Sequence, residues 1–322
     1  MGVYTMDSFL LALNVVFPLL VMMAAGALIR RAGMIDQHTI DQLNRVLYKL
    51  LLPLMLFVNT YKLTLEEIFN PLTGELSLAI IACDVIVITL LVLILPKVVH
   101  ASEKCGVMIQ GFFRSNLILF GIPIYQSVYG DGNLAMITVL VALIIPAINI
   151  MSVIVLEIFN PKSGQLTIRK LLCGIVKNPL VQGPVFAVIC IFLHIRIPLL
   201  LSQSLSTIGS ISTPLAFIVL GASLKLGSIK RNWRYLLFSV AGKLYFMPFV
   251  LFVICLALGM RNHLLVMVLG AMASPTAISS FAMAKEAGGD ADLAAEIVAL
   301  GSACSIFTIF TWVFFLKQFH FI

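Results

Sequence analysis

Long apolar stretches recur along the chain and are separated by short polar connections. A helix that crosses a bilayer needs about 20 mostly apolar residues. Ten stretches meet this requirement, roughly at residues 8–29, 38–61, 75–96, 105–129, 133–158, 169–194, 199–224, 233–259, 263–285 and 292–317. The connections contain Gly, Pro, Asn and charged residues, which is typical of turns. The pattern predicts an all-α polytopic membrane protein with ten transmembrane helices and no room for a folded extramembrane domain.

Composition supports this interpretation. Of the 322 residues, 61% are hydrophobic and 11% are charged, and the mean hydropathy is +1.10. Soluble domains are about 45–50% apolar and about 25% charged. The six cysteines lie in or beside apolar stretches without metal-binding or redox spacing, so we expect packing thiols, no metal site and no cofactor.

The basic residues indicate how the chain is oriented. The formal net charge is +7, but no basic aromatic module for nucleic acid is present. Connections after odd-numbered stretches hold twelve Lys and Arg residues: Arg30, Arg31, Lys97, Lys104, Lys162, Arg169, Lys170, Lys225, Lys230, Arg231, Arg234 and Lys285. The opposite connections hold four: Lys62, Arg196, Arg261 and Lys317. Because positive residues stay in the cytoplasm, both termini are expected on the non-cytoplasmic side of the plasma (inner) membrane.

Two of the apolar stretches are interrupted. Gly121-Ile122-Pro123 lies in 105–129, and a segment from Met272 to Thr276 that contains Pro275 lies in 263–285. Proline lacks a backbone N–H and clashes with the carbonyl one turn back, so a helix must kink or break there. Interrupted helices at matching places in two halves of a chain point to the binding site of a transporter.

Sequence offsets predict two repeats. Pro53 and Pro214 are 161 residues apart, and Pro123 and Pro275 are 152 residues apart. Residues 1–161 and 162–322 would each hold five helices, and an odd number makes the second repeat enter the membrane upside down. The expected fold is two inverted five-helix repeats with crossing interrupted helices 4 and 9.

The two breaks have the chemistry of an anion site. Ser274 and Pro275 suit the N-cap and first position of a helix, and Gly121 supplies backbone freedom before Pro123. Free N–H groups and positive helix-dipole ends in the gap would favour a carboxylate. Ser115 and Ser279 could add hydrogen bonds, and Asn116 either faces the ligand or bonds a neighbouring helix. The predicted substrate-binding residues are Asn116, Gly121, Pro123, Ser274, Pro275 and Thr276, and no catalytic residue is predicted.

Two ionisable residues lie near the middle of apolar stretches. Asp84 and Lys243 are 159 residues apart, in the third and eighth stretches, and such residues are costly in a membrane. They form either a static brace, as a buried pair, or an ion-coupling site in which Asp84 carries a proton or binds a cation. Basic residues nearer the ends of the stretches are expected to snorkel to the interface; they are Arg45, Lys49, Arg114 and Lys177.

In these motifs the chain resembles the auxin efflux carrier family, which includes plant PIN carriers and bacterial relatives. The resemblance runs the whole chain and is most specific from Asn116 to Gly130 and from Pro275 to Ala284-Lys285-Glu286, with further pieces at Pro53 and from Ala216 to Gly221. It implies a scaffold of spans 1, 2, 6 and 7, a mobile transporter domain of spans 3–5 and 8–10, an elevator-like motion, and a possible homodimer through the scaffold. Family substrates are small organic carboxylates, auxin-like acids or malonate-like dicarboxylates.

The sequence also departs from the family. Plant carriers place a lysine one turn after the acidic residue in span 3, where this chain has Ile88, so the resemblance does not carry a proton-handling role over to Asp84. The long cytoplasmic loop of many plant members is absent, because only about ten residues join the fifth and sixth stretches.

The sequence fits four functions unequally. The first is a secondary carrier that exports small organic anions, with proton or sodium coupling left open. The second is a sodium-coupled organic-anion importer resembling the bile acid symporters, which needs more oxygen ligands beside the crossing than this sequence offers. An intramembrane enzyme is disfavoured because no His-Glu-x-x-His motif or nucleophile–base constellation is present. A receptor that does not transport is disfavoured by the paired breaks.

Overall fold

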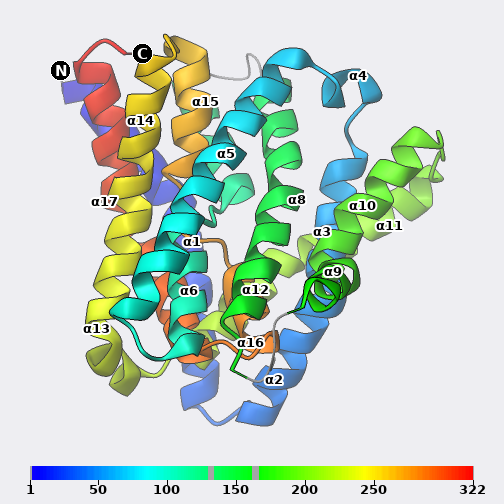
Figure 1. Cartoon of the computed structure of the whole chain (residues 1–322), viewed down its shortest axis with the longest axis vertical. Coiled ribbons are helices and arrows are strands. Elements are labelled where there is room, and N and C mark those ends of the chain that lie inside the picture. Colours follow the sequence, from blue (N-terminus) through cyan, green and yellow to red (C-terminus); the bar gives the residue numbers. More distant parts are fainter. Residues whose placement is uncertain (1, 130–133, 162–166, 322) are drawn as a thin grey trace.

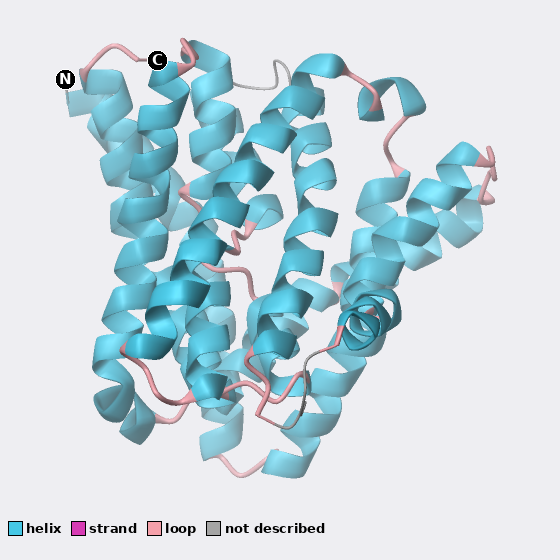
Figure 2. Ribbon diagram, viewed as in Figure 1, coloured by secondary structure: helices cyan, strands magenta, loops and turns pink. Residues whose placement is uncertain are grey.

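The computed structural model describes all residues except 1, 130–133, 162–166 and 322. The described chain is all-helical and forms no sheet; its one β-type contact is an isolated antiparallel bridge between Ser115 and Thr276. Figure 2 shows helices throughout, joined by short loops. The N- and C-termini lie at the same end of the molecule, and α2 (Gln37–Val46) and α16 (Ser279–Glu286) lie at the other (Figure 1).

Within the described part of the chain, six helical segments are long and apolar enough to cross a membrane, and a bent pair makes up to seven. They are formed by α1 (Gly2–Arg31), α5 (Pro71–Ile94) with η2 (Leu95–Lys97), α8 (Leu134–Ile158), α11 (Leu199–Ser210) with α12 (Ser212–Ser223), α13 (Leu226–Ala241) with η4 (Gly242–Phe246) and α14 (Met247–Ala257), and α17 (Ala291–Gln318). The bent pair is α9 (Ile168–Lys177) with α10 (Pro179–Phe192), at an angle of 66°. The prediction of a multi-pass membrane protein is confirmed.

The remaining helices are shorter. Besides α2 and α16 they are η1 (Leu47–Leu51), α3 (Leu52–Tyr61), α4 (Leu65–Ile68), α6 (Ser102–Phe113), η3 (Leu117–Gly121), α7 (Ile122–Tyr129) and α15 (Asn262–Met272). Several of them follow one another directly, so that α2, η1 and α3 form one continuous helical run.

Three π-helical turns interrupt these runs, and each ends two residues before a proline. η1 precedes Pro53, η3 precedes Pro123 and η4 precedes Pro248. A proline inside an α-helix removes one hydrogen bond and its ring collides with the carbonyl four residues back. A wider π turn moves that carbonyl and lets the helix continue past the proline.

This arrangement corrects one prediction. Gly121-Ile122-Pro123 does not interrupt its helix, because the π turn of η3 runs directly into α7 at Ile122. The break lies earlier, at Arg114 to Asn116, where the backbone is extended after the end of α6. The predicted break around Pro275 is confirmed: α15 ends at Met272 and α16 begins at Ser279.

Close helix packing depends on glycine at several positions. α1 packs along α12, and α3 packs along α10 and α11. A Cβ on Gly221 of α12 would collide with the Met23 carbonyl of α1, and one on Gly26 would collide with the Ile218 carbonyl. Small residues at such crossings let two backbones approach, which is how membrane helices gain packing energy.

Candidate functional site

The two breaks meet in the interior. The Asn116 N–H donates to the Pro275 carbonyl at 2.9 Å, and the Ala277 N–H donates to the Arg114 carbonyl at 3.1 Å. These bonds make the isolated bridge between Ser115 and Thr276. Buried backbone groups need partners, and here each extended segment satisfies groups that the other leaves free. The structure therefore brings together two segments about 160 residues apart.

Side chains from the second break also bond back to the helices. The Thr276 hydroxyl donates to the Gly111 carbonyl of α6 at 2.7 Å. The Ser274 hydroxyl donates to the Ala271 carbonyl of α15 at 2.7 Å, so it closes the helix before the break. The prediction of Ser274 as an N-cap is wrong, because α16 starts four residues after Pro275 and has no side-chain cap.

Lys243 in η4 lies beneath this crossing and is 1% exposed. Its ammonium donates to the Ser115 hydroxyl, to the Met272 carbonyl at 3.2 Å and to the Phe113 carbonyl at 3.4 Å. Phe113 and Met272 are the last residues of α6 and α15. A cation at a helix C-terminus is stabilised by the helix dipole, and Lys243 contacts two such ends at once.

Asp84 on α5 is fully buried, and neither carboxylate oxygen has a hydrogen-bond partner among the described residues. It interacts electrostatically with Lys243, but no described Asp84 oxygen lies within 4.0 Å of the ammonium. The expected direct pair is therefore not formed in this structure. Lys243 instead donates hydrogen bonds to groups at the crossing. Asp84 interacts with Lys243 electrostatically, without a direct contact.

A cavity of about 60 Å³ lies beside the crossing. Its apolar wall comes from α3, α8, η3 and Ile278. Its polar lining consists of Arg114, Ser115, Asn116, Asn149, Thr213 and Ser279. This volume has room for about four to six water molecules, or for one small polar group.

Asn116 is the only predicted substrate-binding residue that lines this cavity. Its side chain is 7% exposed, and its amide Nδ2 has no hydrogen-bond partner among the described residues. A buried amide donor without a partner costs free energy, and a ligand in the cavity would remove that cost. This geometry favours a ligand-facing Asn116 over an interhelical hydrogen bond.

The other predicted binding residues build the crossing rather than the cavity. Ser274, Pro275 and Thr276 make the bonds described above. Gly121 packs against α15: a Cβ there would lie 3.3 Å from the Cα of Ala271. Pro123 lies in the first turn of α7 and does not line the cavity.

Arg114 corrects another prediction. It does not snorkel to an interface but is 2% exposed at the crossing. One terminal nitrogen donates to Asn149 Oδ1 at 2.7 Å and to Ser279 Oγ at 2.9 Å, and the other contacts the Met283 sulfur. Asn149 on α8 is held in turn by its own donation to the Leu180 carbonyl at 3.0 Å. Sequence reasoning missed Asn149, although an amide in an otherwise apolar stretch is a detectable signal.

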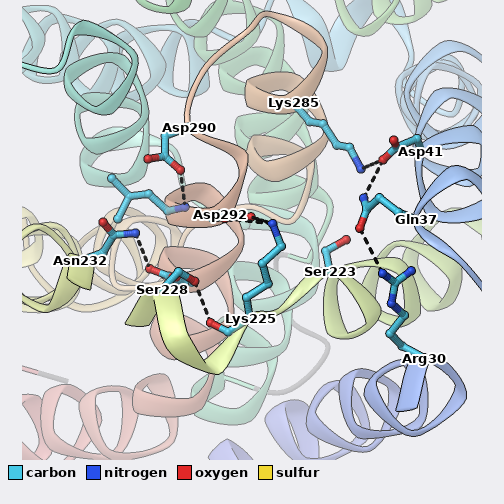
Figure 3. Close-up of polar contacts among 12 residues, drawn as sticks. Arg30, Gln37, Asp41, Ser223, Lys225, Ser228, Asn232, Lys285, Asp290 and Asp292 are labelled. Atoms are coloured by element: carbon cyan, nitrogen blue, oxygen red, sulfur yellow. Dashed lines mark hydrogen bonds and ion pairs between the residues drawn. The ribbon is translucent and has the colours of Figure 1, made fainter. Parts of the chain in front are cut away.

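A second group of polar contacts lies at the end of the molecule away from the termini (Figure 3). Lys285 of α16 pairs with Asp41 of α2 at 2.6 Å, and Glu286 of α16 accepts from Asn44 of α2 at 3.3 Å. These contacts tie the helix after the second break to α2. Among the described residues, no three His, Cys, Asp or Glu side chains are grouped closely enough to hold a metal ion.

The known proteins that this chain is similar to are described as membrane transporters. Residues 11–313 match a family described as membrane transport proteins, which are transporters and not enzymes. The chain is 24% identical over 277 residues to a protein named uncharacterized transporter YfdV of Escherichia coli strain K12, a match that covers 83% of this chain and 85% of that protein. The YfdV proteins of Escherichia coli O157:H7 and Shigella flexneri match equally. The resemblance to the auxin efflux carriers is thereby confirmed, and this multi-pass membrane protein belongs to the membrane transport protein family.

Proposed function

We propose that the protein is a secondary transporter that carries small organic anions across the membrane by elevator-like alternating access. The observation that carries this proposal is the cavity beside the crossing. It holds a buried amide donor without a partner, Asn116, next to a buried cation, Arg114. Hydrogen-bond donors and positive charge inside an apolar wall suit a small carboxylate.

The architecture that goes with this function is ten membrane-crossing segments in two inverted repeats, residues 1–161 and 162–322. In support, α6 and α15 end 159 residues apart, at Phe113 and Met272, and meet through antiparallel backbone bonds. Asp84 and Lys243 have the same offset. Repeats of opposite orientation would make equivalent half-helices approach the midplane from opposite sides.

Part of the helix packing supports the division into scaffold and transporter domain. The proposed scaffold, spans 1, 2, 6 and 7, corresponds to α1, α2 with α3, α9 with α10, and α11 with α12. Within it α1 packs on α12, and α3 packs on α10 and α11, while α1 also packs along α17 of the proposed transporter domain. The cavity is lined by Leu52, Met55 and Thr213 from this group and by Asn116, Asn149 and Ser279 from the proposed transporter domain. A substrate there would lie between the moving and the fixed parts.

Further parts of the proposal rest on the sequence. The distribution of basic residues supports both termini on the non-cytoplasmic side of the plasma (inner) membrane, and the family resemblance supports efflux and a homodimer through the scaffold. Gly121, Pro123, Ser274, Pro275 and Thr276 would serve substrate binding by holding the crossing in shape. Asp84 and Lys243 would support it or couple transport to a proton or sodium ion.

A thermal-shift screen tests the proposal. Purified protein is heated with small mono- and dicarboxylates, supplied as sodium and as choline salts. A ligand that binds only the folded state raises the apparent stability, by about 2.7 kcal/mol at 100 times its dissociation constant. Any stabilising acid is then measured as a radiolabelled substrate in proteoliposomes. Absence of uptake, despite binding, would contradict transport, and uptake only with sodium would favour the importer.

A further inference from the structure

We propose that Arg114 is the positive charge that holds the substrate's carboxylate, and that this single charge makes the cavity selective for monoanions with an apolar body. The inference rests on the proposed function and names the recognition chemistry of its site. It concerns the side chains of Arg114, Asn149 and Ser279.

The guanidinium of Arg114 is buried among neutral groups. Arg114 is 2% exposed, lines the cavity, and has no carboxylate oxygen within 4.0 Å among the described residues. Its hydrogen-bond acceptors are the Asn149 amide, the Ser279 hydroxyl and the Met283 sulfur, all of which are neutral. The arginine is therefore held in place without being neutralised.

Burying Arg114 without a counterion costs free energy. A buried charge is normally paired, because leaving it without a counterion in a medium of low dielectric costs several kcal/mol. Within a membrane protein such a residue marks a site for a charged ligand. An anion that enters the cavity would supply the missing counterion, so its binding would be driven by the charge already there.

A carboxylate is the group that suits the hydrogen-bond donors of this cavity. A guanidinium presents five N–H donors that suit a carboxylate, and Arg114 retains donors beyond those used by Asn149, Ser279 and Met283. The unpartnered Nδ2 of Asn116 lines the same cavity and adds one more donor. With a volume of about 60 Å³, the cavity in this conformation takes the carboxylate and the first carbons of the body attached to it.

The rest of the substrate would lie against apolar side chains. The wall around the polar group is apolar, with Leu52 and Met55 from α3 and Ile145 and Ile148 from α8. The other buried cation at the crossing, Lys243, bonds two helix ends and does not line the cavity. A second carboxylate would therefore meet apolar side chains and no counterion, which disfavours dianions.

Binding of matched ligands to four variants tests the inference. The probes are hexanoate, its uncharged isostere hexanamide, and the dianion adipate, with a series from propionate to octanoate and phenylacetate as a wider set. We expect a monocarboxylate to bind the wild type at least 10-fold more tightly than its amide or the dicarboxylate. Arg114→Gln should weaken binding of the acid by about 10- to 100-fold without changing binding of the amide, and Arg114→Lys should lose less.

Asn149→Asp covers the case in which Arg114→Gln does not fold. The new carboxylate would stand where Asn149 Oδ1 lies, 2.7 Å from the guanidinium, and supply a permanent counterion. This variant gains a charge pair with Arg114 but loses the Asn149 donation to the Leu180 carbonyl, so its fold is checked by heating before binding is measured, and it should lose affinity for the acid. Arg169→Gln, an exposed residue at the start of α9, is the matched control and should bind like the wild type.

The outcomes separate the two proposals. If no carboxylate binds the wild type, the proposed function fails and the inference fails with it. If an acid binds but Arg114→Gln or Asn149→Asp binds it equally well, only the role of Arg114 is overturned. Equal binding of acid and amide would also overturn that role, and tighter binding of the dicarboxylate would overturn the preference for monoanions.

Discussion

Lys243 provides the sharpest test of how the crossing is held together, through the substitution Lys243→Met. Methionine keeps most of the length and apolar character of the lysine stem and removes the ammonium. The change leaves the Phe113 and Met272 carbonyls and the Ser115 hydroxyl without their buried donor. These groups hold the ends of both half-helices, so the loss falls on the crossing itself.

The magnitude follows from those contacts. A hydrogen bond from a charged donor contributes about 1.5–3 kcal/mol, and the bond to Phe113, at 3.4 Å, lies at the weak limit. The bonds to Ser115 and Met272 then amount to about 3–6 kcal/mol. At about 2 °C per kcal/mol, the apparent Tm should fall by about 6–12 °C.

The assay uses the protein's own thiols. Cys83, Cys105 and Cys255 are buried and free, so a thiol-reactive fluorescent dye reports unfolding, with exposed Cys173 as an immediate baseline. Lys285→Met is the control, because Lys285 pairs with Asp41 near the surface and such pairs contribute about 0–1 kcal/mol. Equal decreases in the apparent Tm of Lys243→Met and Lys285→Met would refute the conclusion that Lys243 stabilises the crossing.

A double-mutant cycle extends this test to Asp84. If the charges interact through space, Asp84→Asn combined with Lys243→Met should cost less than the sum of the two single changes. Strict additivity would mean that Asp84 has no part in holding Lys243.

Three further predictions concern single positions. Asn116→Ala should weaken binding of the carboxylate identified in the screen, because it removes the unpartnered amide from the cavity, and unchanged affinity would assign Asn116 to packing. Asp84→Asn should abolish the pH dependence of uptake if Asp84 carries a proton, whereas persisting pH dependence in proteoliposomes would leave Asp84 a structural role beside Lys243. Gly221→Ala should lower the apparent Tm, because its Cβ would collide with the Met23 carbonyl. The control, Gly227→Ala, has open space at its Cβ and should leave the apparent Tm unchanged or slightly higher. Equal effects of the two substitutions would refute the argument for α1–α12 packing.

The candidate site was partly predictable from local chemistry. Asn116 was predictable because an amide is unusual inside an apolar stretch, and the break at Pro275 because proline lacks a backbone donor and follows Ser274. The position of the first break was not predictable from Pro123, since a π turn absorbs that proline and the chain instead breaks at Arg114 to Asn116. Whether a proline bends, breaks or is accommodated depends on which neighbouring groups can bond the freed carbonyls, and these come from distant parts of the chain.

Sequence alone determined that this chain is a helical multi-pass membrane protein, because apolar length and backbone satisfaction in lipid allow little else. It also determined that two distant segments would be irregular. Only the tertiary structure decided which groups meet there. Arg114 reads as an interfacial residue in the sequence, but it becomes a buried cation because the second break, Asn149 and Ser279 pack around it. Burial and the supply of partners are properties of the assembled helices, and they decide whether a charged residue faces water or a ligand.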